Sequence, residues 1–119
     1  MSVQGILDRR RAQRQELLDR AESYVAEVEA RFPVRRAVVF GSVARGDFNL
    51  WSDIDLLLVI EGMMGNPLER MDAVEPRPPL VQPVIWTPEE WHAQRARGNQ
   101  IVREASTQGV WLRGSPADP

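Results

Sequence analysis

The stretch AVVFGSVARGDFNLWSDIDLLLVI (residues 37–60) holds two short apolar runs, and the arrangement of these runs decides the fold of the chain. Residues 37–40 have the length of a short β-strand and are followed by Gly41 and Ser42, whereas residues 54–60 begin directly after an aspartate. The five aliphatic residues that end the second run predict a strand covered on both faces. About a dozen residues separate the runs, which is enough for one short helix around residues 43–45 and a loop through Asn49.

Upstream of this stretch the sequence predicts one long helix. Apolar residues recur at spacings of three and four between about Val3 and Phe32, with arginines and glutamates between them. Pro33 then ends the helix. The residues predicted to face inward are Leu17, Ala21, Val25, Val28 and Phe32.

Downstream, residues 61–80 are rich in glycine and proline and predict a loop with one short helix near residues 67–74. Residues 81–86 have the pattern of a third strand. Pro83 within that strand indicates an edge position or a bulge, because proline cannot donate to a strand ladder.

A helix start follows the third strand. Thr87 is a capping residue, Pro88 suits the first helical position, and Glu90 stands three residues after the cap, as in a capping box. We expect one final helix that runs to about Ser106, followed by the apolar residues 110–112.

Helices that alternate with short strands predict an α/β or α+β fold, in which a small mixed β-sheet is flanked by helices. The length of 119 residues suits one domain, which we place at residues 1–112. The remaining residues, 113–119, are predicted to form a disordered tail.

Composition excludes several kinds of chemistry. The chain has no cysteine, one histidine and no lysine among its 15 basic residues. Disulfides, thiolate metal sites, cysteine nucleophiles, histidine metal clusters and lysine Schiff bases are therefore excluded. Any metal ion must be held by oxygen ligands, and residues 52–90 carry eight acidic residues against two arginines.

Charge and hydropathy restrict the partners. A net charge of −2 argues against general affinity for nucleic acid, because such binding depends on many basic residues that neutralise phosphates. Arg9, Arg10, Arg11 and Arg14 are interpreted as part of a solvated helix face, because acidic residues accompany them. No apolar stretch is long enough to span a bilayer, and the first residues lack the apolar core of a signal peptide, so we expect a cytoplasmic protein with no membrane partner.

Asp53 and Asp55 are candidate metal ligands. Strand side chains repeat every two residues, so both carboxylates point to one face, about 6 to 7 Å apart. Two such carboxylates repel each other unless a cation lies between them. Mg²⁺ is commonly held by one or two carboxylates together with substrate phosphates, so the pair predicts a magnesium site and a phosphate-bearing substrate.

Gly41 and Ser42 are candidate phosphate-binding residues. Gly41 allows the backbone to approach a ligand closely, and Ser42 opens a helix whose N-terminus attracts anions. If the two strands are neighbours, the glycine and serine meet the aspartates only when the strands run antiparallel. Arg45 and Ser52 lie between the two halves, and each could reach a phosphate or hold the loop.

These residues resemble the motif of the DNA polymerase beta-like nucleotidyltransferases, specifically their minimal nucleotidyltransferase branch. That motif is Gly-Ser, a spacer of about ten residues and Asp-x-Asp, and the spacer here is residues 43–52. The motif match covers roughly residues 38–60, and the order of elements fits loosely over most of the chain. The matching residues are Gly41, Ser42, Ala44, Arg45, Gly46, Ser52, Asp53, Ile54, Asp55 and Leu56.

The resemblance implies a nucleotidyltransferase fold in which Gly41 and Ser42 bind a nucleoside triphosphate (NTP). It also implies that Asp53 and Asp55 are the catalytic residues and hold Mg²⁺, as two ions. Members of this family transfer a nucleoside monophosphate to a hydroxyl, and pyrophosphate leaves. Minimal members are often encoded with a helical HEPN-type toxin, and some modify a tyrosine of that toxin, which implies an antitoxin with a HEPN-type partner.

The sequence departs from this pattern at the third strand. The family's third catalytic carboxylate usually lies there, and this chain has Gln82, a neutral amide that cannot act as a general base. Asp72, Glu75 and Glu61 are the candidates to replace it. Two functions therefore remain open: an Mg²⁺-dependent nucleotidyltransferase, or a catalytically impaired module that binds nucleotide, metal or partner.

The aromatic residues are predicted to be structural. Trp86, Trp91 and Trp111 are assigned to the core or to an interface, because aromatic burial is the common case. Trp51, beside the aspartates, either flanks a base or covers the end of the sheet, and we favour the second. His92 is expected on the surface of its helix.

Overall fold

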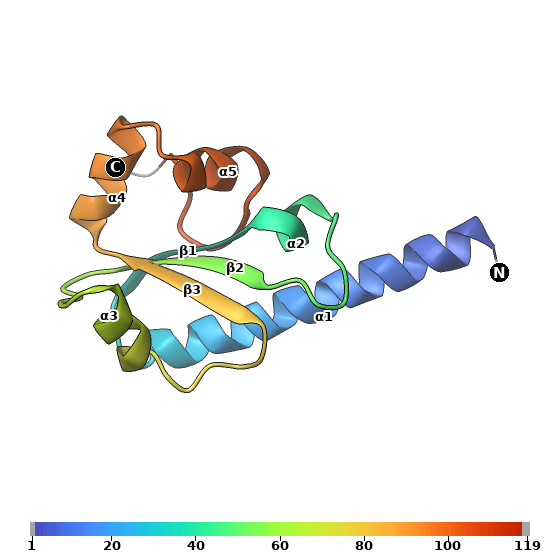
Figure 1. The fold of residues 1–119 in the computed structure, drawn as a ribbon, viewed down its shortest axis with the longest axis horizontal. Coiled ribbons are helices and arrows are strands. Elements are labelled where there is room, and N and C mark those ends of the chain that lie inside the picture. Colours follow the sequence, from blue (N-terminus) through green and yellow to red (C-terminus); the bar gives the residue numbers. More distant parts are fainter. Residues whose placement is uncertain (1, 118–119) are drawn as a thin grey trace.

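The structure is a computed structural model and describes residues 2–117. Long α1 lies along one face of the sheet, and α4 and α5 lie on the other (Figure 1). The predicted fold, a mixed sheet flanked by helices, is confirmed. The helices are α1 (Val3–Glu29), α2 (Gly41–Arg45), α3 (Pro67–Ala73), α4 (Pro88–Ala96) and α5 (Gln100–Gln108), and the strands are β1 (Val34–Phe40), β2 (Ile54–Ile60), β3 (Val81–Trp86) and β4 (Val110–Arg113).

The four strands lie in the order β3-β2-β1-β4. β1 and β2 are antiparallel neighbours, as the sequence predicts, whereas β2 and β3 are parallel. The antiparallel register pairs Phe40 with Asp55, so the end of β1 lies beside the start of β2. β3 is an edge strand, which confirms the position inferred from Pro83.

The core has two parts, one on each face of the sheet. Leu56 and Leu58 of β2 pack with α1, whereas Leu57 and Val59 pack with Trp91 on the opposite face. All four of these β2 side chains are fully buried, which confirms a strand covered on both faces. Burial of each such aliphatic side chain contributes about 1.5–3 kcal/mol, so the central strand is a main source of stability.

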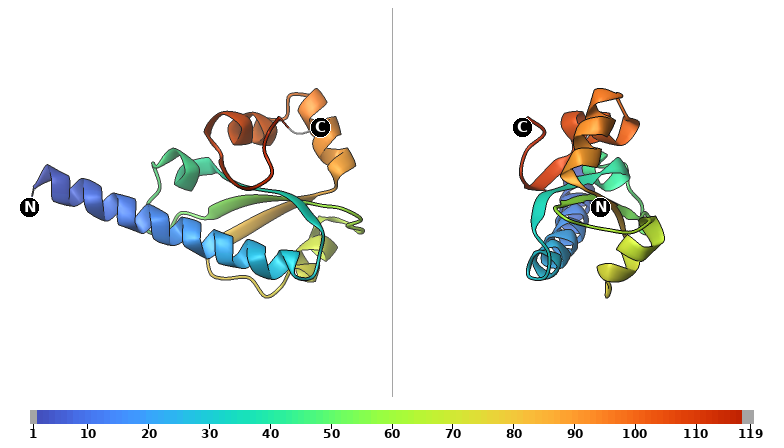
Figure 2. Two further views of the ribbon diagram at one scale, coloured as in Figure 1. Left: turned by 180° about the vertical axis from the view of Figure 1, so that it is seen from behind. Right: turned by 90° about the vertical axis from the view of Figure 1, so that its left-hand side faces the viewer.

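The N-terminal part of α1 extends beyond the sheet, as Figure 2 shows from behind. Val3, Ile6 and Leu7 in this part are 74%, 48% and 45% exposed. Farther along, the helix buries Leu18, Ala21, Tyr24, Val25 and Val28, with Leu17 and Phe32 packed at the margin of the core. Among residues 2–117, no helix is both long and apolar enough to cross a membrane.

The prediction of one C-terminal helix is wrong. α4 ends at Ala96 and α5 begins at Gln100, because Gly98 takes a left-handed conformation with φ of 68° and Asn99 caps α5 by accepting from the Ile101 N–H at 2.8 Å. The break lets α5 fold back over the sheet.

The apolar residues after α5 form β4, which pairs with β1. The Trp111 indole donates to the Ala105 carbonyl at 3.0 Å, which fastens the strand to α5. Arg113, assigned to the tail by its sequence, ends β4 and forms an ion pair with Glu29 at 2.7 Å. Of the predicted tail, residues 118–119 lie outside the described part of the chain.

Trp91 is fully buried, and the other two predicted core tryptophans are half-buried around it. The Trp91 ring meets the Trp111 ring edge to face, with centroids 6.0 Å apart and planes at 83°. Trp86 lies 6.5 Å from Trp91 on the other side. These rings confirm the structural interpretation, and they tie α4, β3 and β4 together. His92 is exposed, as expected.

Tyr24, the only tyrosine, offers a direct test of this packing. Its hydroxyl donates to the Val74 carbonyl at 2.9 Å, and burial raises its pKa from 10.0 to about 12. Stability conferred by the neutral phenol should therefore be complete below pH 10 and fall as the pH rises towards 12. An absorbance titration of the tyrosinate band should show ionisation well above pH 10 in the folded chain and near 10 in urea. A midpoint near 10 in both states would contradict this packing.

Candidate active site

Gly41 lies against the carboxylate of Asp55, where the end of β1 meets the start of β2. A Cβ atom on Gly41 would stand 2.3 Å from Asp55 Oδ2, which is closer than any real contact. The φ of Gly41 is 75°, a conformation that other residues adopt only under strain. Space and backbone conformation both require glycine here, and the backbone consequently passes directly beside the carboxylate.

Asp53 and Asp55 place two carboxylates at the start of β2. Asp53 is exposed and Asp55 is half-buried. Within residues 2–117, neither carboxylate takes part in a hydrogen bond or an ion pair. The pKa of Asp55 is raised, first by burial, then by the charges of Asp53 and Glu104, against a lowering effect of Arg45. A divalent cation would relieve this repulsion.

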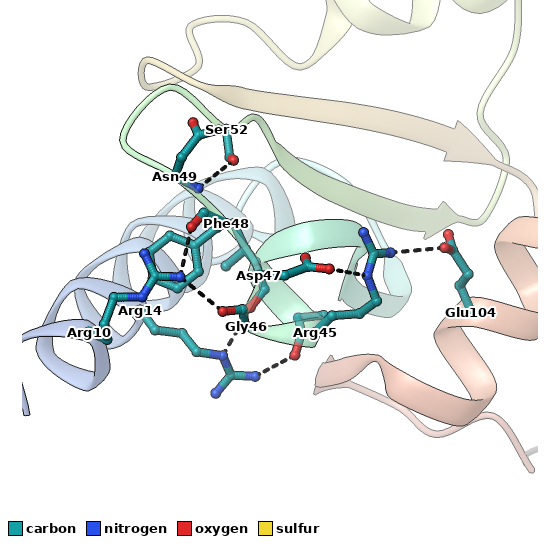
Figure 3. Close-up of polar contacts among 11 residues, drawn as sticks. Arg10, Arg14, Arg45, Gly46, Asp47, Phe48, Asn49, Ser52 and Glu104 are labelled. Atoms are coloured by element: carbon teal, nitrogen blue, oxygen red, sulfur yellow. Dashed lines mark hydrogen bonds and ion pairs between the residues drawn. The ribbon is translucent and has the colours of Figure 1, made fainter. Parts of the chain in front are cut away.

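Arg45 ends α2 and lies between two other carboxylates (Figure 3). Its Nε donates to Asp47 Oδ2 at 3.2 Å, and its Nη1 donates to Glu104 Oε1 of α5 at 3.1 Å. Ser42 is half-buried in the first turn of the same helix. Two of the residues predicted to contact phosphate, Ser42 and Arg45, thus lie at opposite ends of α2, which begins with Gly41.

Ser52 holds the loop that precedes the aspartates. Its Oγ accepts from the Asn49 N–H at 2.8 Å, and Asn49 Oδ1 accepts from the Trp51 N–H at 2.8 Å. The side chain of Trp51 is 84% exposed, so the prediction that it covers the end of the sheet is wrong. The short hydrogen-bonded turn directs the indole outward instead.

Two arginines of α1 bind the backbone of α2 and of the loop that follows it, which corrects the interpretation of their helix face as solvated (Figure 3). Arg10 Nη2 donates to the carbonyls of Gly46 at 3.0 Å and Phe48 at 2.7 Å. Arg14 donates to the carbonyls of Val43 and Ala44 at the end of α2, at 2.9 and 2.8 Å. Sequence reasoning missed this role because the partners are backbone carbonyls about 30 residues away.

Gln82 of β3 pairs in register with Asp55 of β2, so it stands where the third carboxylate was expected. Its Oε1 accepts from Arg77 Nη1 at 3.3 Å. The proposed replacements do not complete the site: Glu75 binds Arg77 at 2.9 Å, Glu61 binds Arg35, and Asp72 is an exposed residue of α3. In the described part of the chain, no three acidic or histidine side chains are grouped so as to hold a metal ion.

The residues present nevertheless fit a hard divalent cation. The donors are two unpaired carboxylates at the start of β2, Asp53 directly before the strand and Asp55 within it. Glu104 is the acid that sequence reasoning missed. Its charge raises the pKa of Asp55, although α5 lies about 50 residues farther along the chain, so only the folded structure brings the two residues close enough.

A family model described as a nucleotidyltransferase domain matches residues 21–94, which include both aspartates and both strands that carry the motif. The chain belongs to the nucleotidyltransferase domain family. This membership confirms the resemblance drawn from the Gly-Ser and Asp-x-Asp motifs. The matched region ends within α4, so α5 and Glu104 lie beyond it.

Solved structures of other proteins share the fold of this nucleotidyltransferase domain. A protein from Sulfolobus solfataricus assigned to the nucleotidyltransferases superposes with a TM-score of 0.60 at 22% identity, over 86% of this chain and 84% of that one. A toxin–antitoxin structure with AMP-PNP superposes with a TM-score of 0.50 at 20% identity, over 79% of this chain and 73% of that one. At these identities the likeness shows the fold alone. None of the curated proteins matches the chain.

Proposed function

We propose that this chain is an Mg²⁺-dependent nucleotidyltransferase that moves a nucleoside monophosphate from an NTP to a hydroxyl. The observation that carries the proposal is the pair of unpaired carboxylates, Asp53 and Asp55, of which Asp55 lies against Gly41 in a nucleotidyltransferase domain. In the reaction, the hydroxyl oxygen bonds to the α-phosphorus, the bond from that phosphorus to the bridging oxygen breaks, and pyrophosphate leaves. The hydroxyl proton passes to solvent.

Each site residue has one role in this proposal. Asp53 and Asp55 hold the divalent ions, which supply activation of the attacking oxygen and neutralisation of the leaving group. Gly41 admits the triphosphate beside Asp55, and the Ser42 hydroxyl donates to a phosphate oxygen. Arg45 neutralises phosphate charge, as a guanidinium with several donors can do.

A second function is favoured by one observation, the register of Gln82 beside Asp55. Without a carboxylate at that position, the chain would keep nucleotide or metal binding but transfer slowly or not at all. It would then act by binding a helical partner of the HEPN type, as an antitoxin. The likeness to a toxin–antitoxin structure supports a toxin as the partner for either function, and the HEPN type is part of the proposal.

Labelled ATP separates the two functions. The chain is incubated with Mg²⁺, ATP labelled at the α-phosphate and a HEPN-type toxin, and transfer to the toxin is followed. The enzyme predicts label transfer that is lost in Asp53→Asn and retained in Asp19→Asn, an exposed acid of α1 that serves as the control. A tight complex with no transfer would support the binding module. Neither transfer nor Mg²⁺-dependent binding of a non-cleavable ATP analogue would exclude both.

A further inference from the structure

Arg45 lies one helical turn after Gly41, whose backbone adjoins Asp55, yet its guanidinium forms no ion pair with Asp53 or Asp55. A guanidinium is the strongest competitor that this site contains for a divalent cation, because it binds a carboxylate through two hydrogen bonds. An arginine seated on Asp53 and Asp55 would close the metal site. Another contact must therefore hold the Arg45 guanidinium away from the two aspartates.

Glu104 provides this contact. Its side chain is 29% exposed, and it accepts from Arg45 Nη1 at 3.1 Å, while Asp47 accepts from Nε. Two carboxylates therefore engage the guanidinium from different sides (Figure 3). Asp47 alone is the weaker tether, because its side chain is 63% exposed and water screens the pair.

We propose that Glu104 is a positioning residue that holds the Arg45 guanidinium away from the Asp53–Asp55 pair and so keeps the pair open to a divalent cation. This inference rests on the proposed function. Glu104 comes from α5, outside the region matched by the family model, so this part of the site is a property of the C-terminal elements of this chain.

The inference separates two effects of Glu104. As a charge, it attracts a cation directly, whatever Arg45 does. As a positioning residue, it acts only through Arg45, so its effect should disappear when Arg45 is removed. A double-mutant cycle measures this difference, because the coupling between two side chains appears as non-additivity.

The test is Mn²⁺ binding to the full chain without nucleotide, measured by titration calorimetry. We expect Glu104→Gln to weaken Mn²⁺ binding about tenfold, as loss of an outer-shell partner typically does. Arg45→Met should bind Mn²⁺ at least as tightly as the wild type. In the Arg45→Met background, Glu104→Gln should cost only about twofold, the direct effect of one partly screened charge. Glu61→Gln removes a charge from an exposed ion pair at the other end of β2 and should change nothing.

Equal losses in both Arg45 backgrounds, or no loss in Glu104→Gln, would overturn the inference and leave the proposed function standing. Mn²⁺ binding that survives Asp55→Asn would instead count against the proposed function. A wild-type chain that binds no Mn²⁺ would remove both.

Discussion

Asp55→Asn should abolish nucleotidyl transfer and, at the same time, raise the melting temperature of the metal-free protein at neutral pH. Loss of a metal ligand removes several kcal/mol of transition-state stabilisation, so the transfer rate should fall by about a thousandfold or more. Mg²⁺ should raise the melting temperature of the wild type and leave that of Asp55→Asn unchanged, because only the wild type binds it.

The gain in stability follows from the raised pKa of Asp55, which burial causes. A carboxyl whose folded pKa is raised favours folding while it is protonated, and this contribution is lost as the pH rises through the folded value. At neutral pH the charged group therefore opposes folding, and asparagine removes that cost. The difference between variant and wild type should shrink as the pH falls towards 3.8, the ordinary pKa of the group.

Asp53→Asn is the matched control. Asp53 is exposed and contributes only its repulsion of Asp55, so the same change should reduce transfer and raise the melting temperature of the metal-free chain less than Asp55→Asn does. Thermal unfolding by circular dichroism, with and without Mg²⁺, measures all three proteins. A metal-free Asp55→Asn chain that melts below the wild type at pH 7 would show that Asp55 is a structural residue and would contradict the assignment.

Gly41→Ala should destroy the site by displacing Asp55. The new methyl group would overlap Asp55 Oδ2, which stands 2.3 Å from the Cβ position, so either the carboxylate or the start of β2 must move. We expect loss of Mn²⁺ binding and of transfer. The strained φ of 75° adds a fall in unfolding free energy of about 1–3 kcal/mol, seen as a lower midpoint in urea.

Gly62→Ala is the control that separates backbone strain from the overlap between a Cβ atom and the Asp55 carboxylate. Gly62 has a similar φ of 76°, but a Cβ there meets nothing within 4 Å. It should lose a similar amount of stability and keep full Mn²⁺ affinity. If Gly41→Ala binds Mn²⁺ as tightly as Gly62→Ala does, the close approach of backbone and carboxylate has no part in metal binding.

Much of the sheet follows from local pattern. Residues 54–60 form a buried strand because their aliphatic run can be satisfied only by covering both faces, and the core on each side confirms it. The α4 start follows equally directly, since Thr87 and Glu90 form the reciprocal capping hydrogen bonds that their spacing predicts. Such features depend on neighbours within a few residues.

The break between α4 and α5 could not be predicted from local pattern. A single glycine within a helical pattern costs only about 1 kcal/mol, so Gly98 alone does not predict a break. The break forms because α5 gains more by returning to the sheet, where Val102 and Ala105 are buried beside Trp91. That gain depends on tertiary packing.

The sequence by itself determined the family, the antiparallel neighbours β1 and β2, and the candidate residues Gly41, Ser42, Asp53 and Asp55, because motif and strand period act over short distances along the chain. Only the tertiary structure decided what surrounds them. Arg10 and Arg14 bind backbone carbonyls of the α2 segment, and Glu104 reaches Arg45 from α5. These contacts join residues about 30 to 60 positions apart in the sequence. No periodic pattern in the sequence predicts which partner a long polar side chain will contact.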